Sequence, residues 1–234
     1  MNTPAIEVHD LSVRYGAVRA LDSVDLTLHH GQIHGLIGTN GSGKSTLFNS
    51  LMGEITPTCG TVGVADRAGH LVSYVPQAEA VDWTFPLTVG EVVMTGRYGH
   101  MGFLRRPRAA DRAAVADAMG RTDLTCLADR QIGQLSGGQK KRTFVARGLA
   151  QQARTVLLDE PFAGVDTTSQ SMITDLLHEM AASGVCILIS THDLASVDAL
   201  CDTVTLLHSR VIAHGVPPEV MTTDNLLTTF GTVA

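Results

Sequence analysis

A short glycine-rich segment, residues 38–45, constrains the fold of this chain more than any other feature. It reads Gly-Thr-Asn-Gly-Ser-Gly-Lys-Ser and fits the pattern G-x-x-x-x-G-K-[ST], in which backbone N–H groups surround the oxygens of a polyphosphate. Lys44 would contact the β- and γ-phosphates of a nucleotide, and the Ser45 hydroxyl would hold Mg²⁺. The candidate nucleotide-binding residues are Gly38, Asn40, Gly41, Ser42, Gly43, Lys44, Ser45 and Thr46.

The residues on both sides of this phosphate loop favour the fold that such a loop needs. Residues 32–37 form a short apolar run that is typical of a buried strand. After the loop, apolar residues recur at helical spacing from Leu47 to Met52, and Gly53 is suited to end a helix. The order strand, loop, helix predicts a phosphate-loop nucleotide-binding core rather than an isolated glycine-rich turn.

Composition and charge limit the classes of protein that remain. The chain has 234 residues, of which 44% are hydrophobic and 17% charged, so we expect one globular domain spanning residues 1–234. The net charge of −6, with no long basic tract, argues against a nucleic-acid partner. The four cysteines are widely separated, which favours neither a disulfide framework nor a zinc site.

The chain shows neither a signal peptide at its N-terminus nor an apolar run long enough to span a bilayer. We therefore expect a cytoplasmic protein that could dock on a membrane protein.

Apolar patterns elsewhere predict an α/β fold with a mostly parallel sheet. Strands are expected at residues 6–15, 24–28, 72–75, 155–159 and 185–190. A helix with an apolar face is expected at residues 172–180, between the last two strands, which is the βαβ arrangement of a parallel sheet. Residues 86–150 read as a helical insert, because Thr88 and Glu91 fit a capping box and residues 109–119 are rich in alanine.

Two acidic residues follow one of the buried strands and suit the chemistry of a nucleotide phosphate. Asp159 ends the strand at residues 155–159, and Glu160 comes next. A carboxylate at that position can reach Mg²⁺, and the following one can orient an attacking water. Without the phosphate loop, a solvated turn would be the preferred interpretation of these two residues, so the hypothesis depends on that loop.

A second glycine-containing motif, Leu-Ser-Gly-Gly-Gln at residues 135–139, has two compatible interpretations. Ser136 and Gln139 have the spacing of a capping box, and Phe144, Val145 and Leu149 continue a helical pattern. A helix N-terminus that contains two glycines is also an anion-binding site, because its free N–H groups point outward.

These three elements, in this order, resemble the ATP-binding subunits of ABC transporters, and the resemblance covers nearly the whole chain. It implies a phosphate-loop core with a mostly parallel sheet, an N-terminal antiparallel β subdomain and a helical subdomain at about residues 86–150. It also implies ATP hydrolysis with Mg²⁺ bound by Ser45, Gln77 and Asp159.

Further positions match the family one by one. Tyr15 corresponds to the aromatic residue that stacks on adenine, and Gln77 to the Q-loop glutamine. Asp166 corresponds to the D-loop aspartate, and His192 to the switch histidine that contacts the γ-phosphate. Glu160, His192 and Gln77 would be the catalytic residues. Two departures are Ala-Gly-Val-Asp at residues 163–166, where Ser-Ala-Leu-Asp is usual, and Lys-Lys-Arg at residues 140–142.

The family resemblance also implies partners. Two copies would pair head to tail around two ATP molecules, so that Lys44 and Ser45 of one copy act with the signature of the other. The residues that would contact ATP across the dimer are Ser136, Gly137, Gly138, Gln139 and Asp166. A separate integral membrane permease, and indirectly an extracytoplasmic substrate-binding protein, would complete the transporter at the inner face of the cell membrane.

The segment after Gln77 resembles the manganese, zinc and iron uptake branch of the family. Trp83, Phe85, Tyr98 and Phe103 gather there, although aromatic residues make up only 4% of the chain. Such a cluster could form a groove for the permease, or it could simply pack the helical insert. The ten histidines suggest a metal site, but we expect strand alternation to separate His29, His30 and His34.

Other functions remain open at this level. An importer of ferric siderophores, haem or cobalamin would carry a similar ATPase. A non-transport ATPase of the same superfamily would be expected to have tandem cassettes or long coiled coils, which this sequence lacks. The motif at residues 135–139 argues against a phosphate-loop kinase or GTPase.

Overall fold

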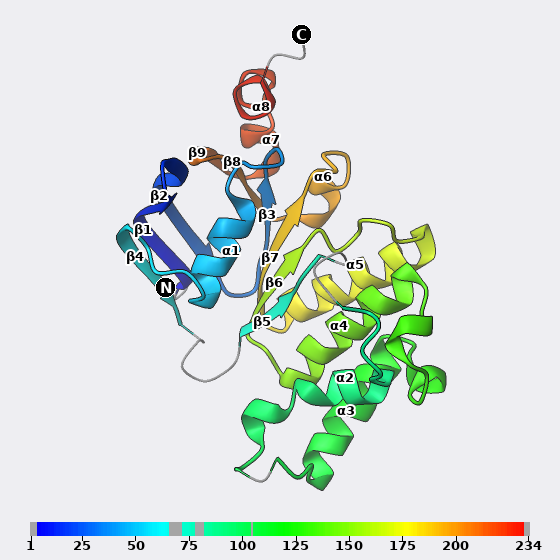
Figure 1. The fold of residues 1–234 in the computed structure, drawn as a ribbon. Coiled ribbons are helices and arrows are strands. Elements are labelled where there is room, and N and C mark those ends of the chain that lie inside the picture. The colour runs from blue at the N-terminus through cyan, green and yellow to red at the C-terminus, as the bar shows by residue number, and fades with distance from the viewer. Residues whose placement is uncertain (1–3, 66–71, 78–81, 104, 232–234) are drawn as a thin grey trace.

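The computed structural model describes residues 4–65, 72–77, 82–103 and 105–231, which form two sheets and a group of helices (Figure 1). The strands are β1 (Pro4–Tyr15), β2 (Val18–His29), β3 (Ile33–Ile37), β4 (Cys59–Val64), β5 (Val72–Val75), β6 (Thr155–Asp159), β7 (Cys186–Thr191), β8 (Thr203–His208) and β9 (Arg210–Gly215). The α-helices are α1 (Lys44–Met52), α2 (Val89–Thr95), α3 (Ala109–Arg121), α4 (Gly137–Gln151), α5 (Thr167–Ala182), α6 (Val197–Leu200), α7 (Pro217–Val220) and α8 (Thr223–Phe230). Short 3-10 turns lie at Tyr98–His100, Thr125–Leu127 and Ile132–Gln134.

The N-terminal strands form a three-stranded antiparallel sheet in the order β2-β1-β4. Along β1, alternating residues such as Ile6 and Val8 point into the core, while Glu7 and His9 are solvent-exposed. This period of two is what an antiparallel sheet with one buried face requires.

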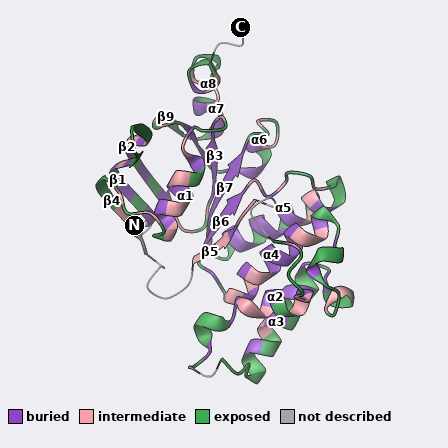
Figure 2. Ribbon diagram, viewed as in Figure 1, coloured by how far each residue is buried: buried purple, intermediate pink, exposed green. Residues whose placement is uncertain are grey.

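The larger sheet has six strands in the order β5-β6-β7-β3-β8-β9. All neighbouring strands are parallel except for the antiparallel pair β8 and β9 at one edge. Strands β3, β6 and β7 are buried at every residue, as expected of central parallel strands covered on both faces (Figure 2).

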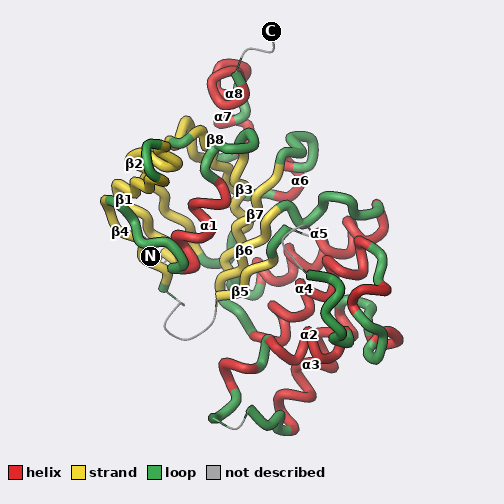
Figure 3. The backbone as a smooth tube through the Cα atoms, viewed as in Figure 1, coloured by secondary structure: helices red, strands yellow, loops and turns green. Residues whose placement is uncertain are grey.

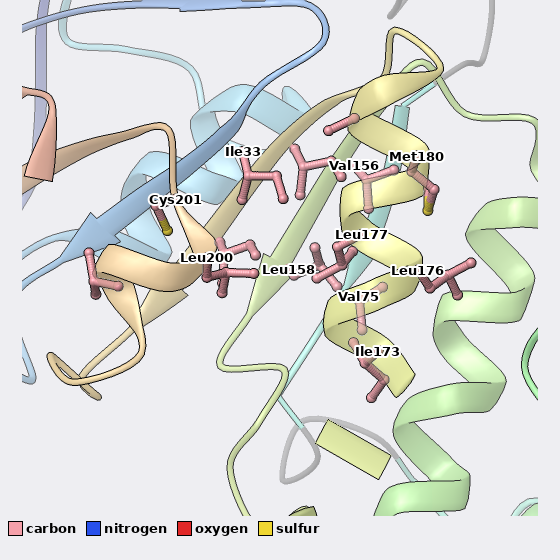
Figure 4. Close-up of a cluster of buried hydrophobic side chains, with 14 of the residues drawn as sticks. Ile33, Val75, Val156, Leu158, Ile173, Leu176, Leu177, Met180, Leu200 and Cys201 are labelled. Carbon is pink, nitrogen blue, oxygen red and sulfur yellow. The ribbon is translucent and has the colours of Figure 1, made fainter. Parts of the chain in front are cut away.

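Two apolar clusters lie on opposite faces of the parallel sheet. On one face, Leu36, Leu157 and Leu188 pack with Leu47 and Phe48 of α1 and with the antiparallel sheet. On the other face, side chains of the strands meet those of α5 and of Leu200 and Cys201 at the end of α6 (Figure 4). The labelled members of this second cluster are Ile33, Val75, Val156, Leu158, Ile173, Leu176, Leu177, Met180, Leu200 and Cys201.

The helices α2, α3 and α4 pack together beside the β5 edge of the parallel sheet (Figure 3). A third apolar cluster holds them together, and Arg97, which is 6% exposed, forms a buried ion pair with Asp111 at 3.1 Å. Helix α4 is tied to β5 by two hydrogen bonds, from Arg147 to the Tyr74 carbonyl and from Gln151 to the Val72 carbonyl.

The predicted fold class is confirmed, and several local predictions hold. Thr88 and Ser136 both form capping boxes, and Gly53 ends α1 in a left-handed conformation with φ of 78°. Strands β4, β8 and β9 were not predicted, because their residues lack a long apolar or alternating pattern. The expectation that alternation along one strand separates the histidines was wrong. His29 ends β2 and His34 lies on β3, and the His34 ring contacts the His29 backbone.

Candidate functional site

The phosphate loop joins the end of β3 to the start of α1, as its sequence requires. Gly43 has φ of 103° and Gly41 has φ of 82°, conformations that residues with a Cβ rarely adopt. A Cβ on Gly38 would lie 2.3 Å from the Leu207 carbonyl oxygen, so β8 packs directly behind the loop. The loop is further fixed by the hydrogen bond from the Ser209 N–H to the Ser42 carbonyl at 2.8 Å.

Lys44 is buried, and its side chain folds back toward the first residues of the loop. Its ammonium donates hydrogen bonds to the carbonyls of Gly38 at 2.7 Å and of Thr39 at 3.0 Å, and the residue is 7% exposed. Burial lowers the pKa of Lys44, while the negative charges of Glu160 and Asp159 act in the opposite direction. The loop lysine and the two predicted acidic residues therefore share one site.

Asp159 is the last residue of β6 and is 4% exposed. Its Oδ1 accepts a hydrogen bond from the Ser190 hydroxyl, and its Oδ2 is 3.5 Å from the Tyr74 hydroxyl. Burial first, and the charge of Asp159 second, raise the pKa of Tyr74 to about 12, so this phenol stays protonated. Neither Ser190 nor Tyr74 was identified from the sequence.

Glu160 and His192 face each other at the ends of β6 and β7. His192 Nδ1 lies 3.4 Å from Glu160 Oε2, with 66% of the histidine side chain and 16% of the glutamate side chain exposed. Glu160 has φ of 47°, which is left-handed and uncommon for a residue with a side chain. This conformation turns the Glu160 side chain out of the strand direction.

Gln77 and Tyr15 lie on other elements. Gln77 is half-buried and follows β5, which pairs in parallel with β6, so it lies at the same sheet edge as Asp159. Tyr15 is 52% exposed and ends β1, beside the turn into β2. Strand β2 in turn contacts the phosphate loop, since a Cβ on Gly43 would meet the Ala20 carbonyl at 2.6 Å.

The Leu-Ser-Gly-Gly-Gln motif, here called the signature, lies at the N-terminus of α4. Ser136 and Gln139 satisfy each other, because the Ser136 N–H donates to Gln139 Oε1 at 3.0 Å and the Gln139 N–H donates to Ser136 Oγ at 3.3 Å. Gly138 has no room for a side chain, since a Cβ there would lie 2.8 Å from Asp166 Oδ2.

Asp166 is the N-cap of α5 and accepts a hydrogen bond from the Ser169 N–H at 2.9 Å. That bond lowers the pKa of Asp166.

Apart from Gln77 and Tyr15, the structure brings the predicted residues together in two groups. The phosphate loop, Asp159, Glu160 and His192 form one group, and the signature with Asp166 forms the other. Within the part of the chain that the structure describes, no hydrogen bond or ion pair joins residues 136–139 to residues 38–46.

One residue that sequence reasoning passed over connects the two groups. Lys141 follows the signature on α4 and donates a hydrogen bond to the Glu160 carbonyl at 3.1 Å. Its signal in the sequence was the departure from the family pattern at residues 140–142. Ser190 had a signal as well, because a hydroxyl interrupts an apolar strand opposite Asp159.

The described residues show neither a metal-binding cluster nor a membrane-spanning helix. Among them, no group of three or more His, Cys, Asp and Glu side chains is arranged to hold a metal ion. None of the helices in the described ranges is both long enough and apolar enough to cross a membrane.

Comparison with known proteins agrees with this geometry. The ABC transporter family matches residues 21–163. A manganese transport system ATP-binding protein of Synechocystis is 48% identical over 97% of this chain and 90% of its own length. A zinc transport system ATP-binding protein of Treponema pallidum is 39% identical over 97% of this chain and 87% of its own length.

Solved structures show the same fold. An ABC transporter in an inward-facing conformation aligns with a TM-score of 0.88 and 29% identity, over 98% of this chain and 89% of that one. The protein cbiO1 of Clostridium perfringens, part of an ABC transporter complex, aligns with a TM-score of 0.81 and 30% identity, over 97% of this chain and 94% of that one.

A phosphate-loop fold that carries a signature motif on a separate helix defines a class of ATP-binding subunits. The chain belongs to the ABC transporter family. It binds ATP and is an ATPase, which is the activity of the family's ATP-binding subunits.

Proposed function

We propose that this chain is the ATP-hydrolysing subunit of an importer for manganese, zinc or iron, which works through a separate membrane permease. The observation that carries the proposal is the similarity along nearly the whole chain to ATP-binding proteins of metal transport systems, at 48% identity for manganese and 39% for zinc. The metal is cargo for the permease, and the described residues of this chain contain no site for it.

An importer of chelated metal is the second candidate. A chelated iron transport system protein of Yersinia pestis is 46% identical over 98% of this chain and 80% of its own length. The inward-facing transporter named above is described as being of the metal-chelate type. We prefer the metal-ion proposal because manganese systems recur among the relatives, including one of Bacillus subtilis at 38% identity.

The phosphate-loop group supports a specific role for each of its residues in ATP hydrolysis. Lys44, held beside Asp159 and Glu160, would bind the β- and γ-phosphates, with Tyr15 against the adenine. Glu160 would orient and deprotonate the attacking water, and His192, 3.4 Å away, would hold Glu160 and the γ-phosphate in place.

The donor set at the end of β6 fits Mg²⁺, which prefers oxygen ligands. Asp159 supplies a buried carboxylate, Ser45 a hydroxyl in the first turn of α1, and Gln77 an amide oxygen at the same sheet edge. When bound, Mg²⁺ would neutralise the charge that develops on the phosphate oxygens.

The signature group supports a head-to-tail dimer. Its glycines and the first turn of α4 form an anion-binding helix N-terminus that is not hydrogen-bonded to the phosphate loop of the same copy. A second copy would bring Ser136, Gly137, Gly138 and Gln139 to the γ-phosphate, with Asp166 at the contact between copies.

Exposed aromatic residues on both sides of α2 suit contact with the permease. Phe85 precedes α2, and Tyr98 and Phe103 follow it. They are exposed by 57%, 42% and 102%, and exposed aromatic residues are typical of binding surfaces. Trp83 is not one of these exposed residues, because its ring packs edge-on against Phe144 at 5.6 Å and lies 4.5 Å from the Lys140 ammonium. Docking there would place the subunit at the inner face of the membrane, with an extracytoplasmic binding protein acting through the permease.

The test is metal accumulation in cells that lack this chain, complemented with the wild type or with Glu160→Gln. We expect loss of manganese, zinc or iron uptake that only the wild type restores. Normal metal content together with a defect in haem, siderophore or cobalamin uptake would favour the second candidate. No uptake defect of either kind would contradict both.

A further inference from the structure

A buried serine, Ser190 on β7, joins the two acidic residues of the phosphate-loop group. It lies opposite Asp159 in the parallel register of β6 and β7. Its hydroxyl donates to Asp159 Oδ1 and accepts a hydrogen bond from the Glu160 N–H at 3.0 Å. The residue is fully buried, with an exposed fraction of 0%, so water does not compete for these bonds.

Glu160 needs such support because its backbone is left-handed, with φ of 47°. The Ser190 carbonyl also accepts the Glu160 N–H, at 3.2 Å. On the other side, the Glu160 carbonyl accepts from Lys141 Nζ at 3.1 Å. Two elements, β7 and α4, therefore fix the peptide groups that decide where the Glu160 side chain points.

Asp159 depends on Ser190 more than on its other neighbour. The Tyr74 hydroxyl reaches Asp159 Oδ2 only at 3.5 Å, which is the long limit of a hydrogen bond. Hydrogen bonds to a carboxylate are stronger than neutral ones, and the bond from Ser190 is the shorter of the two. Loss of the Ser190 hydroxyl would leave the buried Asp159 carboxylate held mainly by its own backbone.

We propose that Ser190 is a positioning residue for ATP hydrolysis, whose hydroxyl sets the direction of the Asp159 carboxylate and fixes the Glu160 backbone beside it. The inference rests on the roles proposed above for Asp159 and Glu160. A hydroxyl can do this because it donates one hydrogen bond and accepts others, whereas an alanine or valine at this position can do neither.

The test compares Ser190→Ala with two controls. Ser190→Thr keeps the hydroxyl. Ser73→Ala removes another buried strand serine, on β5, which is 1% exposed and whose hydroxyl has no hydrogen-bond partner among the described residues. For each variant one would measure kcat and KM for ATP, and the Kd for ATP by calorimetry in excess Mg²⁺ and in EDTA. Near-ultraviolet circular dichroism and the unfolding midpoint would show which variants fold.

We expect Ser190→Ala to lower kcat on the order of 10-fold, because it removes a hydrogen bond to a buried charge. KM should change less. The Kd for ATP in EDTA should stay at the wild-type value, while the tightening that Mg²⁺ adds should shrink. Ser190→Thr should recover most of both quantities, and Ser73→Ala should match the wild type.

Two results would overturn the inference. One is a folded Ser190→Ala variant with wild-type kcat and a full Mg²⁺ effect on affinity. The other is an equal loss of affinity in Mg²⁺ and in EDTA, which would indicate a general structural defect. Neither readout depends on which metal is transported, so failure of the import proposal would leave this test intact.

Discussion

The two halves of the candidate ATP site use their hydrogen bonds in opposite ways. In the phosphate-loop half, hydrogen bonds join residues that are far apart in the sequence, as the Ser190 hydroxyl does with Asp159 and the Ser209 N–H does with the Ser42 carbonyl. In the signature half, Ser136 and Gln139 are bonded to each other and Ser136 is exposed. The first half is assembled by the parallel sheet of one chain, whereas the second is a capped helix end with its outer side open.

This difference indicates what each half needs in order to work. The sheet brings residues far apart in the sequence, such as Lys44 and Asp159, to one edge without help from another molecule. Among the described residues, the signature glycines Gly137 and Gly138 pack closely against Gly164, Asp166 and Ser169 on one side, and no hydrogen bond joins the signature to the phosphate loop. The proposed composite site follows from this contrast, and four changes would break or sharpen it.

The largest effect is expected from Glu160→Gln. The amide keeps the shape of the side chain but cannot act as a base, so turnover should fall about 10²- to 10⁴-fold. ATP binding should persist, because Lys44 and the loop are unchanged. Single-turnover hydrolysis and calorimetry with ATP would check both points, and hydrolysis at the wild-type rate would remove Glu160 from the role of base.

Ser136→Arg should disrupt the signature half of the site and leave the phosphate-loop half unchanged. The long cation would block the open side of the signature, so steady-state hydrolysis should be lost while each monomer still binds ATP with the wild-type Kd. A matched control is Thr88→Arg, which changes the N-cap of a helix outside the signature. Weakened ATP binding by the Ser136→Arg monomer would show that the two halves are not separate.

A substitution in the apolar core behind both halves should lower the free energy of unfolding without removing a catalytic group. Leu177 is fully buried on α5, the helix whose N-cap is Asp166, and Leu177→Ala should lower the free energy of unfolding by about 2–5 kcal/mol. Leu227→Ala on α8, where the side chain is 45% exposed, should change it by less than about 0.5 kcal/mol. Urea unfolding of both variants tests this, and equal effects would contradict the described core.

Acidification should lower the free energy of unfolding through His34, a buried residue of the strand that leads into the phosphate loop. His34 on β3 is 1% exposed and bonds Thr203 Oγ1 at 2.6 Å, and burial lowers its pKa to about 4. Because the unfolded state binds the proton with its ordinary pKa of about 6.5, the stability due to neutral His34 is present above that pH and is lost toward pH 4. Between pH 7.5 and 5 the loss should be about 2 kcal/mol.

The corresponding measurement is urea unfolding of His34→Gln at both pH values. This variant should lose less stability on acidification than the wild type, whatever its stability at pH 7.5. His9→Gln, which changes an exposed histidine, should keep the full wild-type loss. Identical pH dependence in His34→Gln and the wild type would contradict the effect of burial.

Much of the fold could be predicted because local patterns determine it. The strand before the phosphate loop, the left-handed Gly53 and the two capping boxes all depend on neighbours in the sequence. The contacts of Ser190 and Tyr74 with Asp159 were not predicted, because they depend on strand pairing between residues that are far apart in the sequence. Strands β8 and β9 were missed because their short sequences carry too weak a pattern, and their order beside β3 depends on strand pairing.

The central claim is that one working site takes the phosphate loop of one copy and the signature of another. Mixing Lys44→Ala with Ser136→Arg tests it most directly, because each variant alone should be inactive. In a mixed head-to-tail dimer, one site combines the intact phosphate loop of the Ser136→Arg copy with the intact signature of the Lys44→Ala copy. The account predicts that mixing restores ATP hydrolysis, and a mixture as inactive as its components would contradict it.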